Sequence, residues 1–307
     1  MILSICPNPS IDCTVEMEQL NVGQLNRVEN KIVTYSGKAL NAAIGVARLG
    51  ADSYATGFMF QNDGSSFVQR LDDEKVKNTF VWDKGSVRIN YKIVDNKSML
   101  TEINDKGEEV SAEKQAELLN LVSNLSENAS VVILSGSLPK GVDNGYYPAL
   151  LKAANKKSKK IVDAEGAKLL LSLKEGVYMA KPNLRELETA VGQRLGTIKE
   201  MLAGTKVLLD GGAENVLLSL GREGAILTDG TKSYFCKSAT VAVNSTVGAG
   251  DSMVAAASVM TECGESKKEI LRCAVAAGTA SITTPGTNLF YRDKYEEIYD
   301  KIFVEEI

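Results

Sequence analysis

The chain contains, at residues 244–252, the stretch Asn244-Ser245-Thr246-Val247-Gly248-Ala249-Gly250-Asp251-Ser252. This glycine-rich turn leads into the apolar segment Met253–Met260, so it predicts a helix that begins near Gly250. Glycines let the backbone approach an anion closely, and the amino end of a helix attracts negative charge. The stretch therefore predicts a phosphate site with Asp251 as a general base for a substrate hydroxyl. In the alternative interpretation, Asp251 only complements the helix dipole.

Short apolar runs alternate with helix-like segments along most of the chain. The runs are Val131–Leu134, Ile161–Val162, Val177–Met179 and Val216–Leu220, and the helix-like segments are Ala112–Leu125, Tyr146–Ala154, Leu184–Val191 and Met253–Met260. The alternation favours an α/β fold with a mainly parallel sheet and helices on both faces. Ligands of such sheets bind at the loops after the carboxyl ends of the strands. We therefore expect the loops that begin at Ser135, Asp163 and Lys181 to form a site.

Two segments alternate with a period of two instead. Residues 11–17 and residues 87–93 each place apolar side chains on one face and polar side chains on the other. The second continues through the turn Asp95-Asn96-Lys97 into Ser98–Ile103, which predicts a hairpin. Together they predict a small antiparallel sheet that covers the active site and excludes water. Its polar residues Asp12, Arg88, Asn90 and Lys92 suit a sugar phosphate, although a merely solvated face is the alternative.

A second glycine turn, Ser36-Gly37-Lys38-Ala39-Leu40-Asn41, follows the strand-like run Lys31–Tyr35 and opens another helix. Gly37 permits close backbone approach and Lys38 supplies a positive charge, but the spacing is not that of a P-loop. An ordinary helix cap is the alternative. Two helix amino ends suited to phosphates are what a kinase needs when it joins a nucleotide to a phosphorylated sugar.

Two further segments suit a nucleotide and its metal. Asn183 and Glu186 lie three residues apart after a strand, so their oxygens can hold Mg²⁺ through waters. Helix capping by Asn183 is the alternative. The turn Ser219–Ala225, which is bounded by glycines, joins two strand-like runs. It predicts either a plain hairpin or a loop around the nucleotide.

Composition excludes several other classes of protein. The chain of 307 residues is 44% hydrophobic, which suits one large globular domain with at most a small appendage. Its formal net charge of −4 gives no general attraction to nucleic acid. The chain has no apolar run long enough to span a bilayer and no signal-peptide pattern at its start. We expect no nucleic-acid or membrane partner and a cytoplasmic location.

Histidine is absent, which excludes Ser-His-Asp and Cys-His nucleophilic systems. The five cysteines form no C-x-x-C pair, which disfavours both a disulfide framework and a structural zinc site. Any general base must therefore be Asp, Glu or Lys.

Taken in order, these residues resemble the PfkB, or ribokinase-like, family of sugar kinases over nearly the whole chain. The motifs that carry the resemblance are Pro7–Asp12, Gly37–Asn41, Ala47–Gly50, Ser135–Pro139, Lys181–Leu187 and Thr246–Ser252. The opening P-N-P-S-x-D, together with Arg88–Lys92 and Thr101–Asn104, is similar to the branch that contains 1-phosphofructokinase and tagatose-6-phosphate kinase.

The resemblance implies a doubly wound, mainly parallel sheet with a small β-sheet lid, all in one domain of residues 1–307. The lid strands would be inserted at about residues 10–33 and 87–108, and the lid implies a homodimer. The implied reaction is ATP-dependent phosphorylation of a ketohexose phosphate, foremost fructose 1-phosphate to fructose 1,6-bisphosphate, with tagatose 6-phosphate as the alternative. The implied ions are Mg²⁺ and, in some members, K⁺.

The same resemblance implies roles for individual residues. The catalytic residues would be Asp251 as base, with Gly248, Ala249 and Gly250 near the anion. The sugar phosphate would be bound by Asp12, Gly37, Lys38, Asn41, Arg88 and Ser137. The nucleotide would be bound by Lys181, Asn183, Ser219, Gly221 and Gly224, and Mg²⁺ by Asn183 and Glu186 through water.

The chain departs from the family pattern at the second glycine turn. The branch has glycine where this chain has Ser36 and Ala39, so two backbone positions carry side chains that can alter the sugar-phosphate pocket. The segment Gly278–Gly286 resembles the adenine-side segment of the family and, in some members, a monovalent-cation loop. The altered turn also leaves open a non-catalytic sensor of sugar phosphate or nucleotide on the same scaffold.

Overall fold

The computed structural model describes residues 1–97, 99–284 and 288–307. The strands of its larger sheet are β1 (Ile2–Cys6), β4 (Ser53–Phe60), β5 (Lys77–Asn78), β6 (Val81–Asp83), β9 (Val131–Ser135), β10 (Lys159–Asp163), β11 (Met179–Ala180), β12 (Val216–Ser219), β13 (Ala225–Thr228), β14 (Ser233–Cys236) and β15 (Val304–Glu306). Their order is β15-β14-β13-β12-β11-β10-β9-β1-β4-β5, and β6 pairs with β4. Neighbours from β12 to β5 are parallel, whereas β12 to β15 pair antiparallel.

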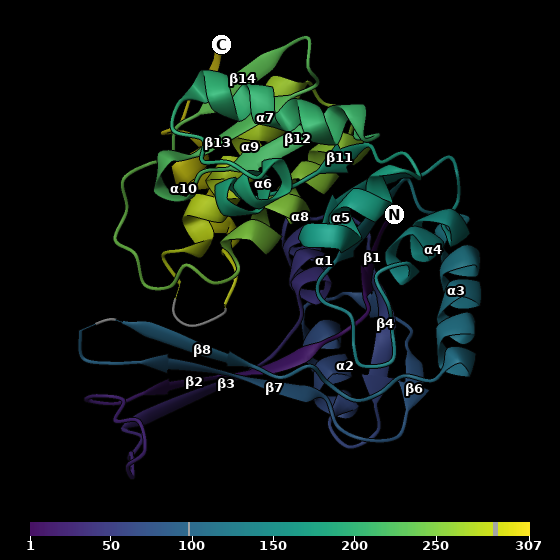
Figure 1. Ribbon diagram of the computed structural model, residues 1–307, viewed down its shortest axis with the longest axis vertical. Coiled ribbons are helices and arrows are strands. Elements are labelled where there is room, and N and C mark those ends of the chain that lie inside the picture. The colour runs from purple at the N-terminus through teal and green to yellow at the C-terminus, as the bar shows by residue number, and fades with distance from the viewer. Residues whose placement is uncertain (98, 285–287) are drawn as a thin grey trace.

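The central strands β1 and β9 are buried along their whole length. This burial explains why their sequences are continuous apolar runs rather than alternating ones. The helices are α1 (Lys38–Arg48), α2 (Gly64–Asp73), α3 (Ala112–Ser126), α4 (Tyr146–Ala153), α5 (Gly166–Leu173), α6 (Leu184–Val191), α7 (Ile198–Asp210), α8 (Ala249–Glu262), α9 (Lys267–Ser281) and α10 (Arg292–Tyr299). The helices form two groups in which neighbours contact one another: α1, α8, α9 and α10 in one, and α3 to α7 in the other. The sheet is therefore covered on both faces (Figure 1), as predicted.

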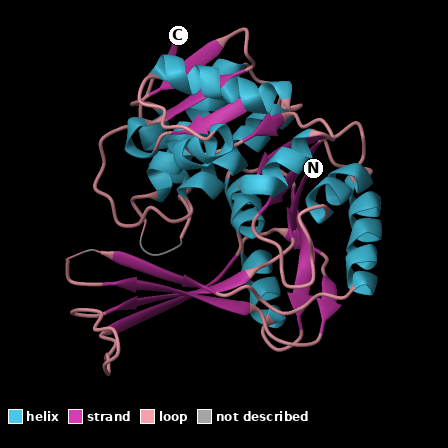
Figure 2. Ribbon diagram, viewed as in Figure 1, coloured by secondary structure: helices cyan, strands magenta, loops and turns pink. Residues whose placement is uncertain are grey.

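A separate sheet, here called the lid, contains β2 (Ser10–Glu16), β3 (Asn30–Ser36), β7 (Arg88–Val94) and β8 (Leu100–Asn104). It projects from the body of the molecule (Figure 2). The amphipathic strands predicted from the sequence are present, and Ser98 of the predicted hairpin lies outside the described residues. The prediction of an antiparallel sheet is wrong at one pairing, because β2 and β7 are parallel. Both strands run outward from the body, and each returns through its own antiparallel hairpin partner.

The two faces of the lid differ in chemistry. In register, Asp12 and Asn90 lie side by side on one face, whereas Tyr91 and Ile103 pair on the other. Asp12 on the polar face is 5% exposed. On the apolar face Cys13, Val15 and Ile93 are also buried, whereas Tyr91 and Ile103 are 43% and 56% exposed. The lid therefore has a buried polar cluster on one face and an apolar surface that is only partly covered on the other.

Most predicted elements of the body occur at the predicted residues. The exception is the run Val177–Met179, because β11 covers only Met179–Ala180 and Val177 forms a single bridge to Ala213. In the described ranges, none of the helices has both the length and the apolar character needed to cross a bilayer. The cytoplasmic location and the assignment of all residues to one domain stay predictions.

Candidate active site

Asp251 lies in the first turn of α8, and its residue is only 8% exposed. The helix begins at Ala249, after Gly248 in a left-handed conformation with φ of 85°. Because Gly248 has no capping side chain, the first N–H groups of α8 are available to an anion. The predicted glycine turn and helix start therefore occur as expected, one residue earlier than Gly250.

Burial raises the pKa of Asp251 to about 6, with Lys38 lowering it and Asp163 raising it to smaller extents. Asn41 donates a hydrogen bond from Nδ2 to Asp251 Oδ2 at 2.8 Å. Within the described residues, Oδ1 receives no hydrogen bond. A carboxylate that is mostly ionised at pH 7, with one oxygen held and the other open, has the properties of a general base.

The start of α1 lies beside Asp251, although the two contacting residues are 210 positions apart in sequence. Gly37 precedes the helix with φ of 153°, and a Cβ atom there would lie 2.8 Å from Cys6 Sγ. Only glycine fits this close approach between α1 and the end of β1. The fit places Lys38 and Asn41 in the first turn of α1, facing the same region as Asp251.

Asp163, at the carboxyl end of β10, forms ion pairs with both Lys38 and Lys181. Lys181 Nζ lies 3.3 Å from its Oδ1 and Lys38 Nζ lies 3.7 Å from its Oδ2, while Ser135 donates to Oδ2 at 3.2 Å. Burial alone would raise the pKa of Asp163, but Lys181 and Lys38 outweigh it and hold this pKa below its usual value. The sequence predicts that the loop beginning at Asp163 contributes to the site, but it does not predict a role for the Asp163 side chain.

The two lysines differ in exposure. The side chain of Lys181 is 5% exposed, whereas that of Lys38 is 49% exposed. Asp163 is the main cause that raises the pKa of Lys38, so this ammonium stays charged. Lys38 is thus the member of the group that can reach a ligand, and Lys181 is the member that neutralises Asp163 internally.

A cavity of about 550 Å³ opens against the start of α8. It contains four of the five predicted nucleotide residues, together with two of the predicted anion-binding residues: Asn183, Ser219, Gly221, Gly224, Ala249 and Gly250. Lys181 does not line it. The wall of residues 237–241 and the apolar side chains Val243, Met253 and Val275 also line the cavity, and no sequence motif predicted them. Ile282, a further lining residue, lies in the segment Gly278–Gly286 that resembles the adenine-side segment.

The loop between β12 and β13 joins a hairpin and also lines the cavity, so it fits both of the interpretations that the sequence allowed. The strands form an antiparallel hairpin joined by a short 3₁₀ helix, Gly221–Glu223, and the same loop lines the cavity. Gly278 also lines it, whereas residues 285 and 286 of the segment Gly278–Gly286 lie outside the described residues.

Asn183 and Glu186 form a reciprocal capping box at the start of α6. Asn183 Oδ1 accepts from the N–H of Glu186 at 2.9 Å, and Glu186 Oε2 accepts from the N–H of Asn183 at 2.8 Å. The capping interpretation is therefore confirmed for this pair. Glu186 Oε1 has no hydrogen bond within the described residues, so the metal role stays a prediction.

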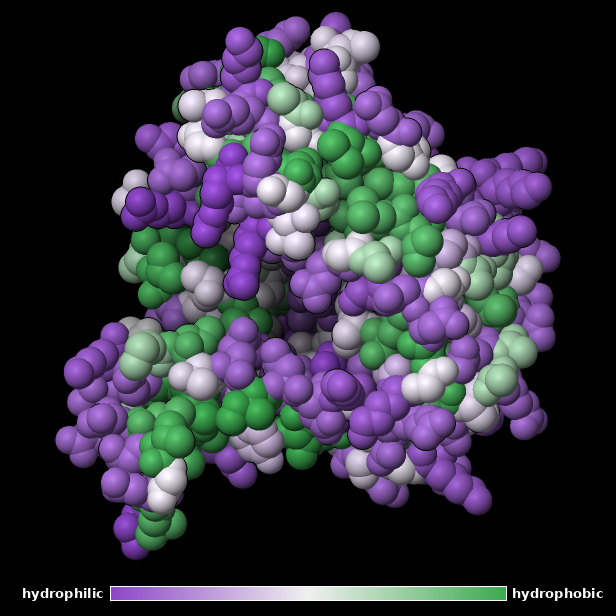
Figure 3. All heavy atoms as spheres, in the orientation of Figure 1, coloured by the Kyte–Doolittle hydropathy of each residue, from purple (hydrophilic) through white to green (hydrophobic). Residues whose placement is uncertain are grey.

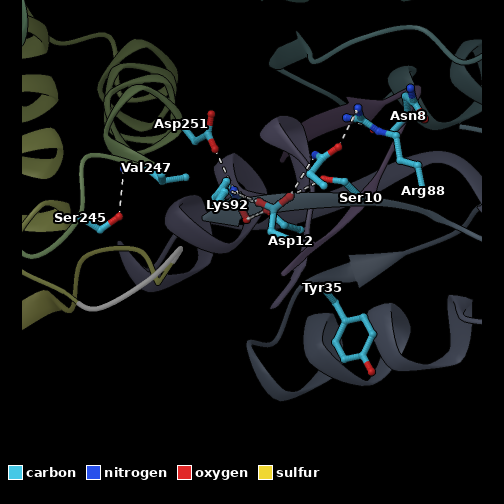
Figure 4. A network of polar contacts seen from close by, with 12 residues as sticks. Asn8, Ser10, Asp12, Tyr35, Arg88, Lys92, Ser245, Val247 and Asp251 are labelled. Carbon is cyan, nitrogen blue, oxygen red and sulfur yellow. Dashed lines mark hydrogen bonds and ion pairs between the residues drawn. The ribbon is translucent and has the colours of Figure 1, made fainter. Parts of the chain in front are cut away.

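On the polar face of the lid, Asp12 accepts three contacts (Figure 4). They come from Lys92 Nζ at 2.8 Å, Asn90 Nδ2 at 3.1 Å and Ser10 Oγ at 3.0 Å. Lys92 and Asn90, which suit a sugar phosphate by their chemistry, both contact Asp12. A hollow with hydrophilic side chains around it separates the lid from the rest of the molecule (Figure 3).

Arg88 and Ser137, two of the predicted sugar-phosphate residues, both form hydrogen bonds with Asn8 and not with Asp251. Arg88 donates to the carbonyl of Asn8 at 3.3 Å, and Asn8 Nδ2 donates to Ser137 Oγ at 3.0 Å. Arg88 also donates to the carbonyl oxygen of Asp105 at 2.9 Å, and burial lowers its pKa. These residues form a second polar cluster where the lid joins the body.

Residues 5–294 match the model of the family described as pfkB family carbohydrate kinase. The chain belongs to this family of carbohydrate kinases. Similar proteins include the 1-phosphofructokinase of Borreliella burgdorferi, 30% identical over 309 residues that cover 100% of this chain and 99% of the relative. The tagatose-6-phosphate kinase of Staphylococcus epidermidis is also 30% identical, over 311 residues that cover 100% of both chains.

Among solved structures, phosphofructokinase-2 from Escherichia coli in complex with substrates and products superposes with a TM-score of 0.90. It is 28% identical, and the match covers 98% of each chain. Membership of the kinase family implies use of ATP and Mg²⁺. Within the part of the chain that the structure describes, His, Cys, Asp and Glu do not gather in a metal-holding set of three. Glu186 Oε1, which the capping box leaves unused, is a carboxylate oxygen of the kind that can hold a water of a Mg²⁺ ion.

Proposed function

We propose that this kinase transfers the γ-phosphoryl group of ATP to a hydroxyl of a ketohexose phosphate. Fructose 1-phosphate, converted to fructose 1,6-bisphosphate, is the first choice of acceptor. The single observation that carries the proposal is the setting of Asp251. It lies buried at the amino end of α8, beside a cavity of nucleotide size on one side and the half-exposed Lys38 on the other.

The geometry supports the following division of roles. Asp251 Oδ2 is held by Asn41, so Oδ1 takes the proton from the sugar hydroxyl as that oxygen attacks the γ-phosphorus. The N–H groups of Ala249 and Gly250 and the dipole of α8 stabilise charge on the transferring group. Lys38 adds a positive charge on the sugar side. Catalysis consists mainly of positioning and charge stabilisation, because phosphoryl transfer needs little covalent help from protein.

The nucleotide would occupy the 550 Å³ cavity, with its base against the apolar wall that includes Val243 and Ile282. When bound, Mg²⁺ would neutralise charge on the phosphates. Asn183 and Glu186 would hold its waters, since Glu186 Oε1 is not used in the capping box. Asp12, Lys92 and Arg88 would face the phosphorylated sugar from the lid.

The identity of the acceptor is the finer part of the proposal. A relative named 1-phosphofructokinase and a relative named tagatose-6-phosphate kinase are equally identical to this chain, so tagatose 6-phosphate is the second candidate. One structural neighbour is a phosphofructokinase-2 in complex with fructose-6-phosphate, which adds a third sugar to the test. Another is a phosphofructokinase-2 in complex with potassium, so the test also includes K⁺.

The test is a coupled ADP-release assay with fructose 1-phosphate, fructose 6-phosphate and tagatose 6-phosphate, each with and without K⁺. We expect the highest kcat/KM with fructose 1-phosphate. A higher kcat/KM for either of the other sugars would change the proposed acceptor but leave the proposed kinase reaction intact. No ADP release with any of the three, while ATP still binds, would favour the sensor alternative.

We also propose that a second copy of the chain covers the apolar face of the lid. Val33, Ile89, Tyr91 and Ile103 share this face and are 39–56% exposed. Hydrophobic residues gather on the lid in Figure 3. An uncovered apolar sheet face of this kind favours association with an identical face across a two-fold axis. Sedimentation analysis should give a dimer for the native chain and a monomer for Ile103→Glu, and a monomeric native chain would contradict the proposal.

A further inference from the structure

Ser36 is a buried serine at the point where the lid joins α1. It is the last residue of β3, it is 2% exposed, and it pairs in register with Ser10 of β2. Its hydroxyl contacts the side chain of Asn41, with Asn41 Nδ2 at 3.1 Å and Asn41 Oδ1 at 3.4 Å. The same Nδ2 atom donates to Asp251 at 2.8 Å. A continuous chain of contacts therefore runs from the lid strand to the carboxylate of Asp251.

We propose that Ser36 is a positioning residue: its hydroxyl holds the carboxamide of Asn41 with the amino group directed at Asp251 Oδ2. This inference rests on the proposed function, in which Asp251 is the base. An ionised carboxylate only accepts hydrogen bonds, so the carboxamide can support it through Nδ2 and not through Oδ1. The Nδ2 group has two hydrogens, and Asp251 and Ser36 each accept one of them.

All three side chains are buried, and burial increases the cost of losing any hydrogen bond between them. Ser36, Asn41 and Asp251 are 2%, 3% and 8% exposed. In such a place water does not readily replace a lost partner, so an unpaired amino hydrogen favours rotation of the carboxamide. Within the described residues, Ser36 and Asp251 are the hydrogen-bond partners of the Asn41 side chain, so without the Ser36 hydroxyl its orientation would depend on Asp251. Asp251 would then lose part of the hydrogen bonding that stabilises its ionised form.

Other charged groups also face Asp251 and must be held constant in a test. They are Lys38 from α1, Asp163 from the end of β10 and Lys181 from the segment after β11. None of them contacts Ser36 through a hydrogen bond or ion pair within the described residues. A change at Ser36 therefore reaches Asp251 through Asn41.

The first experiment compares the pH profile of kcat for the native enzyme and Ser36→Ala. We expect kcat to fall by roughly threefold to tenfold, the value of one hydrogen bond, with the KM for ATP nearly unchanged. The acid limb of the profile should move to higher pH, because the ionised form of Asp251 loses support. An unchanged kcat and an unchanged acid limb would overturn the inference while leaving the proposed function intact.

Ser53→Ala is the matched control. Ser53 is also 2% exposed, and its hydroxyl donates to the carbonyl oxygen of Ala43 in the same helix α1 at 2.8 Å. Its loss should cost stability in the way that Ser36→Ala does, but the acid limb should not move. An equal movement in both variants would show a general effect of loosening α1 and would overturn the inference.

A double-mutant cycle tests the route through Asn41. In the background of Asn41→Ala, the further change Ser36→Ala should have almost no effect on kcat, because the carboxamide is already gone. If Ser36→Ala costs the same in both backgrounds, Ser36 acts by another route and the inference is wrong.

A crystal structure of Ser36→Ala provides a measurement that does not depend on turnover. We expect Asn41 Nδ2 to leave hydrogen-bonding distance of Asp251, and an unmoved carboxamide would contradict the inference. If the native chain phosphorylates none of the sugars but the carboxamide moves as expected, the positioning role stands and the proposed function fails. The two ideas can therefore be rejected separately.

Discussion

The starts of α1 and α8 look alike in sequence but carry opposite charges. Each follows a glycine that serves as N-cap, Gly37 in one and Gly248 in the other. The first turn of α1 contains the half-exposed Lys38, whereas the first turn of α8 contains the buried Asp251. Both helix dipoles present positive ends to the same region. In the proposed mechanism, α8 supplies the base for the acceptor hydroxyl and α1 supplies a cation for its substituents.

The largest effect should come from α8. Asp251→Asn keeps the shape of the side chain but cannot take a proton, so kcat should fall by about 10³-fold. The dissociation constant for ATP, measured by calorimetry, should stay within about threefold because the cavity is unaltered. If kcat of the variant is within tenfold of that of the native enzyme, Asp251 is not the base and the proposed difference in role between the starts of α8 and α1 is wrong.

The next effect separates the two lysines around Asp163. Lys38→Met should lower kcat/KM by about 10²-fold, because it removes a charge aimed at the ligand. Its effect on unfolding should be small, since a half-exposed pair contributes little. Lys181→Met leaves Asp163 without its closer buried partner and should lower the free energy of unfolding by about 3 kcal/mol.

Chemical denaturation and steady-state kinetics on both variants check this contrast. If Lys38→Met costs more stability than Lys181→Met, the assignment of one lysine to the ligand and the other to the fold is reversed.

A third prediction concerns the stability cost of the base. The pKa of Asp251 is raised from 3.8 to about 6, so the folded chain binds protons more tightly than the unfolded chain between these values. Above pH 6 the buried charge costs stability, by up to about 3 kcal/mol if the whole shift is expressed. Asp251→Asn should therefore raise the unfolding midpoint at pH 7.5, and this gain should shrink as the pH falls from 6 to 4. A gain that does not vary with pH would have another cause.

The smallest effect concerns the glycine that precedes α1. Gly37→Ala places Cβ 2.8 Å from Cys6 Sγ at a positive φ, so the free energy of unfolding should fall by about 1–2 kcal/mol. Gly136→Ala is the closer control, because its φ of 114° is also outside the left-handed helical region but no atom lies within 4 Å of the added Cβ. Equal losses in the two variants would show that α1 does not depend on the close approach at Gly37.

Structural features that depend on a few consecutive residues could be predicted from the sequence. The start of α8, the hairpin between β12 and β13 and the amphipathic strands of the lid each depend on a short local pattern. The general position of the site was also predictable, because Asp163 and Lys181 both follow strands of one parallel sheet. Alternation of strands and helices fixes which strand ends share an edge.

Contacts between distant segments could not be predicted in this way. The pairing of Asn41 with Asp251 and the sharing of Asp163 by two lysines depend on how α1, α8 and β10 pack, and no local pattern specifies that packing. The parallel pairing of β2 and β7 was missed because side-chain alternation is the same in parallel and antiparallel strands. The capping box of Asn183 and Glu186 has the same spacing as the predicted metal pair, so sequence alone could not separate them.

The central claim is that buried Asp251, ionised at neutral pH, takes the proton from the acceptor hydroxyl. The most direct test is the pH dependence of kcat/KM for the native enzyme and for Asp251→Asn with the preferred sugar phosphate. The account predicts that the native profile falls below a midpoint near pH 6 and that this limb is missing from the residual activity of the variant. The same acid limb in both proteins would show that another group governs proton removal, and would contradict the account.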